Sequence, residues 1–102
     1  MPKLICKRVT FYSCHDETVF FEWLSKIQGV CKVKGESDEI HVFVPRSVIS
    51  DTCLRELTAL FYRYKIDMQQ LAQFVNEKNR EWYTGKQKYW HNRVFGKPRK
   101  AI

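Results

Sequence analysis

Three adjacent residues, Cys14, His15 and Asp16, are of the types that nucleophilic thiol catalysis requires. A helix N-terminus and a neighbouring histidine both favour the reactive thiolate. Catalytic partners must point at one another, however, whereas side chains adjacent in sequence usually diverge. The triplet together with Ser13 also fits the capping turn that begins a helix. We favour the capping turn, and we predict no catalytic residues and no enzyme activity.

Other catalytic or cofactor-binding patterns are weak. Glu36, Asp38 and Glu39 cluster at an expected hairpin tip, where charged side chains are ordinarily solvated. The four glycines lie too far apart to form a phosphate-binding loop. The four cysteines form no Cys-x-x-Cys pair, and only three histidines accompany them. We therefore predict reduced thiols, no metal and no cofactor.

The strongest functional signal lies between residues 80 and 100, where aromatic and basic side chains alternate. The chain carries a net charge of +7. Residues 76–102 contribute eight basic and two acidic side chains, a net of +6, whereas residues 1–75 contribute ten basic and nine acidic ones. The ligand of this segment is expected to be anionic. The predicted partner-binding residues are Arg80, Tyr83, Lys86, Lys88, Tyr89, Trp90, Arg93 and Lys97.

Three interpretations of this segment remain open. Tyrosine, tryptophan and arginine are common hot-spot residues, which suits an acidic protein surface. Aromatic rings interleaved with cations also suit single-stranded nucleic acid, with Tyr89 and Trp90 stacking on bases and the basic side chains contacting phosphates. In the third interpretation the aromatic residues fold back as core and leave the cations exposed. The residues that would then be core are Trp82, Tyr89, Trp90, Val94 and Phe95.

The elements that must position these residues follow from hydrophobic periodicity. The longest helical periodicity runs from Ser50 to Trp82, broken only at residues 65–67, and predicts an antiparallel helical hairpin. Before it come a strand, a helix that ends at Gly29, and a hairpin of two strands. The predicted ranges are a strand over 3–12, a helix over 16–27, strands over 30–35 and 39–45, and helices over 50–64 and 67–82.

This order predicts an α+β fold, a small βαββαα single domain. A right-handed crossover would make the first two strands parallel, and the hairpin would add the third strand to a mixed three-stranded sheet packed against helices. The result resembles a ferredoxin-like split βαβ unit that lacks its last strand. We expect a compact core over residues 1–85, followed by the basic aromatic segment 86–102, packed on the core up to about residue 95.

The sheet face away from the helices is a second candidate surface. If uncovered, it resembles the RNA-recognition platform in general character, but the closely spaced glycine and aromatic residues of that platform are missing. Exposure of the Tyr12 and Phe43 rings would indicate an open face. The predicted residues are Arg8, Tyr12, Lys32, Lys34, His41 and Phe43.

Together these features predict a non-enzymatic binding protein that recognises an anionic protein partner. A toxin-neutralising immunity protein is one concrete form. The alternative is an RNA or single-stranded DNA binding protein that uses the same C-terminal segment. Short apolar runs interrupted by lysine and arginine predict a cytoplasmic protein with no membrane association. We expect a monomer or a weak dimer.

Overall fold

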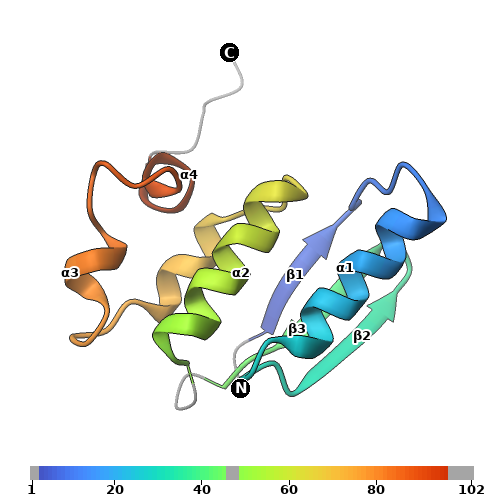
Figure 1. Ribbon diagram of the computed structural model, residues 1–102, viewed down its shortest axis with the longest axis horizontal. Coiled ribbons are helices and arrows are strands. Elements are labelled where there is room, and N and C mark those ends of the chain that lie inside the picture. The colour runs from blue at the N-terminus through green and yellow to red at the C-terminus, as the bar shows by residue number, and fades with distance from the viewer. Residues whose placement is uncertain (1–2, 46–48, 97–102) are drawn as a thin grey trace.

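The computed structural model describes residues 3–45 and 49–96, with a three-stranded sheet and several helices (Figure 1). The predicted small α+β single domain is confirmed. The elements in chain order are β1 (Lys3–Lys7), α1 (Cys14–Lys26), β2 (Lys32–Glu36), β3 (Glu39–Phe43), α2 (Asp51–Arg63), the 3-10 helix η2 (Gln69–Phe74), α3 (Arg80–Tyr83) and α4 (His91–Phe95).

The sheet has the order β1-β3-β2, and β3 is antiparallel to both of its neighbours. β1 and β2 therefore run in the same direction without pairing, which is the predicted split βαβ arrangement. The prediction of a mixed sheet is wrong, because both strand pairings among the described residues are antiparallel. The hairpin turns through only Ser37 and Asp38, so β3 returns directly beside β2 and separates it from β1.

β1 is shorter than the predicted strand over residues 3–12. It ends at Lys7 because Arg8 adopts a left-handed conformation with φ 50°, which is incompatible with a continued strand. The following segment turns Phe11 toward the helices, where its ring lies 5.3 Å from Phe20 and 6.0 Å from Tyr64. The chain therefore leaves the sheet five residues earlier than periodicity indicates.

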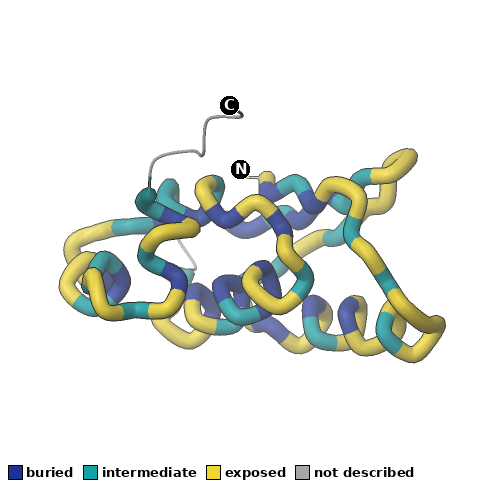
Figure 2. Tube along the Cα trace, turned by 90° about the horizontal axis from the view of Figure 1, so that it is seen from above, coloured by how far each residue is buried: buried dark blue, intermediate teal, exposed yellow. Residues whose placement is uncertain are grey.

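One hydrophobic core joins the sheet to α1 and α2. Leu4 and Val42 come from paired positions of the sheet, and they are fully buried together with Phe20 of α1 and Leu57 of α2. In Figure 2 the buried parts of strands and helices face one another across the interior. Both long helices begin where serine caps are predicted. The Ser13 Oγ accepts a hydrogen bond from the Asp16 N–H, and the Ser50 Oγ accepts one from the Cys53 N–H.

The predicted continuous helix over residues 67–82 is wrong. It is divided into η2, a turn and the short α3, although Leu71 and Phe74 are buried as its apolar stripe predicts. Two asparagines in the turn compete with helical hydrogen bonding. The Asn79 amide accepts a hydrogen bond from the Asn76 N–H at 2.8 Å and donates one to the Phe74 carbonyl at 2.9 Å. The chain consequently changes direction between η2 and α3.

The segment after α3 packs against the same core. Tyr83, Trp90 and Val94 are buried, and Trp82 and Phe95 are partly buried against the core. Packing therefore reaches Phe95, near the point predicted, while the domain boundary placed at residue 85 stays a prediction. Figure 1 shows α3 and α4 grouped beside α2, on the side of the molecule away from β2.

Candidate partner-binding surface

Two of the predicted partner-binding residues belong to the core. Tyr83 is fully buried, and Trp90 is 5% exposed. Their rings are stacked with centroids 5.3 Å apart, and the Trp90 indole N–H donates to the Tyr83 carbonyl at 2.8 Å. The Tyr83 hydroxyl is hydrogen-bonded to the Thr58 hydroxyl at 2.8 Å. Burial raises the pKa of Tyr83 to about 12. The prediction that these two rings contact a partner is wrong, and base stacking by Trp90 is excluded.

The other predicted residues of this segment remain at the surface. Arg80, Lys86 and Arg93 are exposed, and Lys88 is half-buried. Tyr89 is 53% exposed, so it is not core as the third interpretation of this segment expects. Lys97 lies outside the described residues. The exposed part of the segment is therefore cationic, with Tyr89 as its accessible ring.

α2 contributes two residues to this surface that were missed in the sequence. Tyr62 is 40% exposed, and its ring lies 4.8 Å from that of Tyr89 in an edge-to-face arrangement. The Arg93 guanidinium lies 4.6 Å from the Tyr62 ring centroid, and that of Arg55 lies 4.2 Å from Trp82. Arg55 and Tyr62 are seven residues apart, two turns on one helix face, outside the apolar stripe of α2. That spacing is the signal that could have revealed them.

We call this group the aromatic–cationic surface. Tyr89 connects it to the core, because its ring lies 4.9 Å from the buried Trp90. Burial, followed by the neighbouring Tyr62, raises the pKa of Tyr89, against an opposing effect of Arg55. The hydroxyl therefore stays protonated at neutral pH and is available as a donor. The members of the surface are Arg55, Tyr62, Trp82, Lys88, Tyr89 and Arg93.

The predicted second surface on the sheet is only partly formed. Lys32 and Lys34 are exposed on the outer face, and Phe43 is half-buried beside Lys32. Arg8 and Tyr12 do not belong to this face, because both follow the end of β1. Tyr12 is 87% exposed. The exposure of its ring therefore says nothing about whether the sheet is open.

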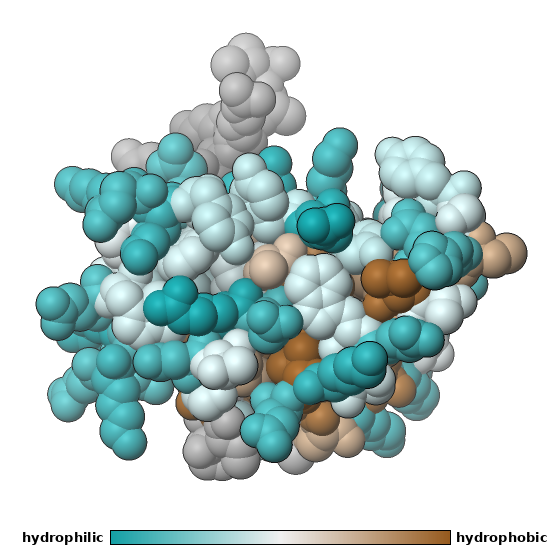
Figure 3. All heavy atoms as spheres, viewed as in Figure 1, coloured by the Kyte–Doolittle hydropathy of each residue, from teal (hydrophilic) through white to brown (hydrophobic). Residues whose placement is uncertain are grey.

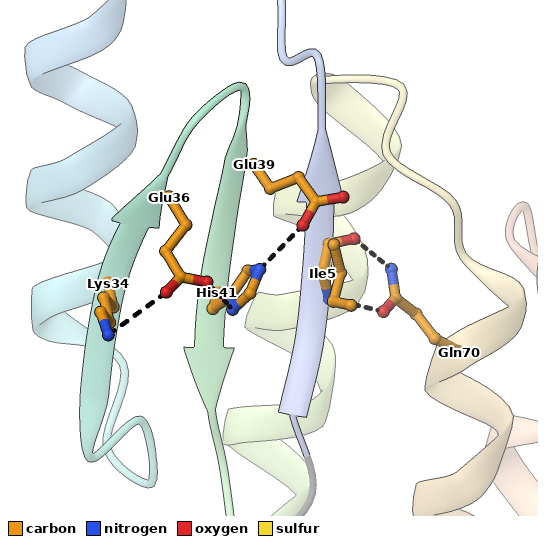
Figure 4. Close-up of polar contacts among 6 residues, drawn as sticks. All are labelled: Ile5, Lys34, Glu36, Glu39, His41 and Gln70. Carbon is orange, nitrogen blue, oxygen red and sulfur yellow. Dashed lines mark hydrogen bonds and ion pairs between the residues drawn. The ribbon is translucent and has the colours of Figure 1, made fainter.

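His41 is 6% exposed on this face, so its expected role as a contact residue is wrong. Its Nε2 lies 2.9 Å from a Glu39 oxygen, and its Nδ1 lies 3.4 Å from Glu36 (Figure 4). Lys34 completes the group at 3.3 Å from Glu36. The hydrogen bond and charge of Lys34, followed by the charge of His41, lower the pKa of Glu36. These polar groups contact one another across two strands, with His41 buried and Lys34 and Glu36 still exposed.

The Cys14, His15 and Asp16 triplet forms a capping turn. The Asp16 carboxylate accepts hydrogen bonds from the Tyr12 N–H at 3.2 Å and the Tyr64 hydroxyl at 3.0 Å, so it does not orient His15. Within residues 3–45 and 49–96, no group of three or more His, Cys, Asp or Glu side chains has the geometry of a metal site. The helices in these ranges are all too short or too polar to span a bilayer.

No protein-family model, curated protein or solved structure gives a significant match to this chain. The functional argument therefore depends on the geometry of the surfaces themselves.

Proposed function

We propose that the protein is a non-enzymatic binding protein that recognises an acidic protein surface through the aromatic–cationic surface. The observation that carries this proposal is the exposed Tyr62 and Tyr89 pair, held edge to face and flanked by Arg93. Tyrosine and arginine are enriched at the energetic centres of protein interfaces, because they combine large contact area with polar ends.

The rigidity of this surface also supports protein binding. Tyr62 lies on α2, and Tyr89 is fixed against the buried Trp90, so two segments far apart in the sequence hold the pair. Side chains already ordered before binding lose little conformational entropy on association. Figure 3 shows hydrophilic side chains projecting around most of the view and strongly hydrophobic residues exposed only in small patches. The partner contact is therefore expected to be polar, with a few aromatic anchors.

Nucleic acid is the weaker candidate because accessible ring faces are few. Trp90 is buried, and guanidinium groups lie over the rings of Tyr62 and Trp82. Only Tyr89 of the two rings assigned to base stacking is exposed. Stacking along a single strand needs successive free rings. The exposed cations still favour some salt-sensitive binding to phosphates, which the test below separates from protein binding.

A toxin-neutralising immunity protein remains the concrete form that we propose. Such a protein needs complementary charge and no catalytic group, and a basic one requires an acidic toxin surface. Cys6, Cys14 and Cys53 are free thiols, and Cys6 and Cys53 are buried. Free thiols are typical of reducing compartments, which supports the proposed cytoplasmic location.

The test compares the wild-type protein with a double variant, Tyr62→Ser with Tyr89→Ser, as affinity baits. A protein captured only by the wild type is then purified, and its affinity for each variant is measured. We expect a partner with an acidic surface and a loss of affinity of at least about 30-fold, the range of interface hot spots. Tyr12→Ser is the matched control, because that ring is exposed but lies outside the aromatic–cationic surface.

A salt series with labelled single-stranded RNA and DNA decides the alternative. In this series the wild type is compared with a triple variant, Lys86→Gln with Lys88→Gln and Arg93→Gln. Nucleic-acid binding would be supported by two results together. The tyrosine double variant would still bind RNA or DNA, and the affinity of the glutamine variant would depend less steeply on salt concentration than that of the wild type. A partner that binds the tyrosine double variant as tightly as the wild type would contradict the proposed surface.

A further inference from the structure

A second basic site lies outside the aromatic–cationic surface. A cavity of about 750 Å³ opens between the segment that joins β1 to α1 and the C-terminal end of α2. Its lining includes Arg8 and Tyr12 from the first segment, and Arg63, Tyr64 and Lys65 from the second. The volume is within the range of small-molecule sites, about 300–1,000 Å³.

The walls of the cavity are fixed by packing and hydrogen bonds. The Asp16 carboxylate joins the two segments, because it accepts from the Tyr12 N–H and from the Tyr64 hydroxyl. The Tyr64 ring is edge to face with the buried Phe20 at 4.9 Å. Desolvation, followed by the hydrogen bond to Asp16, raises the pKa of Tyr64. The part of the wall formed by Asp16 and Tyr64 is therefore preformed, and Asp16, the one carboxylate among the described lining residues, is engaged in structural bonds.

The charges that face the cavity are mainly positive. Arg8, Arg63 and Lys65 line it, together with the imidazole side chain of His15. In the described part of the chain Arg63 and Lys65 form no ion pair, whereas Arg8 is paired with the Asp38 carboxylate at 3.4 Å. Three cations against two carboxylates, Asp16 and the Asp38 partner of Arg8, leave an excess of positive charge. An anionic ligand would relieve their mutual repulsion.

Two of these cations occupy backbone positions that glycine normally takes. Arg8 has φ 50° and Lys65 has φ 57°. Lys65 follows the last turn of α2 in a Schellman motif, since its own N–H donates to the Tyr62 carbonyl and that of Ile66 donates to Phe61. Glycine is the usual residue there, so lysine is kept at some cost in stability. Residues in strained conformations cluster at ligand sites.

We propose that this cavity binds a small aromatic anion, a ring that carries a phosphate or carboxylate group. The cations at the rim would hold the anionic group, and the side chains of Tyr12, Val19 and Trp23 would contact the ring. The inference is independent of the proposed protein partner. It depends on the cavity and its lining side chains; in the first turn of α1, the N–H groups of Asp16 and Glu17 are already bonded to Ser13.

The probes are phenyl phosphate, inorganic phosphate and benzyl alcohol, each titrated into the full chain while NMR follows the Trp23 indole signal. That N–H is hydrogen-bonded to Glu56 at 2.8 Å, which makes it a defined reporter at the cavity. We expect phenyl phosphate to bind at least about tenfold more tightly than inorganic phosphate, which lacks the ring, and than benzyl alcohol, which lacks the negative charge. Inorganic phosphate binding as tightly as phenyl phosphate would show charge attraction alone and overturn the proposal.

Two variants and one control locate the binding. Arg63→Gln and Lys65→Gly each remove a cation, and each is expected to weaken phenyl phosphate about fivefold. Lys65→Gly should at the same time raise the denaturation midpoint, so lost binding cannot be attributed to unfolding. Ser37→Gly is the matched control, because Ser37 has nearly the same φ, 55°, in the β2–β3 turn. It should raise the midpoint and leave binding unchanged. Unchanged binding in both cation variants would refute the site.

Discussion

Gln70 closes the outer edge of β1, and its replacement by methionine is the most direct test of how the C-terminal half is attached to the sheet. The side-chain amide accepts from the Ile5 N–H at 2.8 Å and donates to the Ile5 carbonyl at 2.9 Å (Figure 4). These contacts reproduce the pair of bonds that a neighbouring strand would make. Gln70→Met keeps the length of the side chain but leaves both backbone groups of Ile5 without this partner.

The expected cost follows from these two bonds. Each partly buried hydrogen bond contributes about 1 kcal/mol net, so Gln70→Met should lower the free energy of unfolding by about 2 kcal/mol. The assay is urea denaturation at pH 7, with amide hydrogen exchange of Ile5 as the local readout. Exchange at Ile5 should accelerate about tenfold or more, because its N–H becomes available to water.

Gln69→Met is the control for this experiment. Gln69 lies on the same 3-10 helix and is exposed, and among the described residues its side chain makes only a long contact of 3.3 Å with the Gly96 carbonyl. Its replacement should change stability by less than about 0.5 kcal/mol. Equal destabilisation by the two substitutions, with Ile5 exchange unaltered, would refute the edge-closing role of Gln70.

Two further predictions concern buried polar groups. Burial raises the pKa of Cys6 from 9.0 to about 12, so the folded state keeps this proton longer than the unfolded state. Stability should be unaffected by this group below pH 9 and should fall by about 1.4 kcal/mol per pH unit above it. Urea denaturation between pH 8 and 11 should show this slope reduced in Cys6→Val and unchanged in Cys14→Ser, whose thiol is exposed. Tyr83→Phe removes the buried hydrogen bond to Thr58 and should cost about 1 kcal/mol. A double-mutant cycle with Thr58→Val should return a coupling of similar size, and additive losses would show that the bond contributes nothing.

The parts of the fold that the sequence predicts well are those set by local chemistry. Ser13 and Ser50 cap the two long helices where Ser occurs before an apolar stripe. The β2–β3 hairpin turns where Ser37 and Asp38 interrupt the strand pattern. In each case the residues that decide the structure lie within a few positions of one another. Local periodicity and capping chemistry therefore suffice.

The errors occur where a side chain overrides local periodicity or where distant residues decide the structure. The periodicity over residues 67–82 suits a helix, but the Asn79 side chain binds backbone groups of Asn76 and Phe74 and ends the helical course. Tyr83, and Trp90 in two of the three interpretations of its segment, are predicted at the surface. Each instead finds a polar partner inside, the Thr58 hydroxyl for Tyr83 and the Tyr83 carbonyl for Trp90. Sequence alone cannot show that such partners are available, because Thr58 is 25 residues away from Tyr83.

The missed half of the aromatic–cationic surface has the same cause. Tyr62 belongs to α2, and its meaning depends on Tyr89 and Arg93 returning to that helix from the C-terminal segment. The burial of Trp90 is what brings them back, since Tyr89 directly precedes it and Arg93 follows it by three residues. The aromatic residues that looked like ligands for a partner therefore serve first to place their exposed neighbours.

The state of the two sheet edges is a further reason why we propose that surface, and not strand addition, for recognition. Gln70 occupies the outer edge of β1, so an incoming strand would have to displace two hydrogen bonds. β2 is the other edge, and its exposed side chains include Lys32, Lys34 and Glu36. Charged side chains on a short edge strand disfavour pairing with another chain. With one edge occupied and the other charged, the tyrosine pair on α2 and the C-terminal segment is the better anchor for a protein partner.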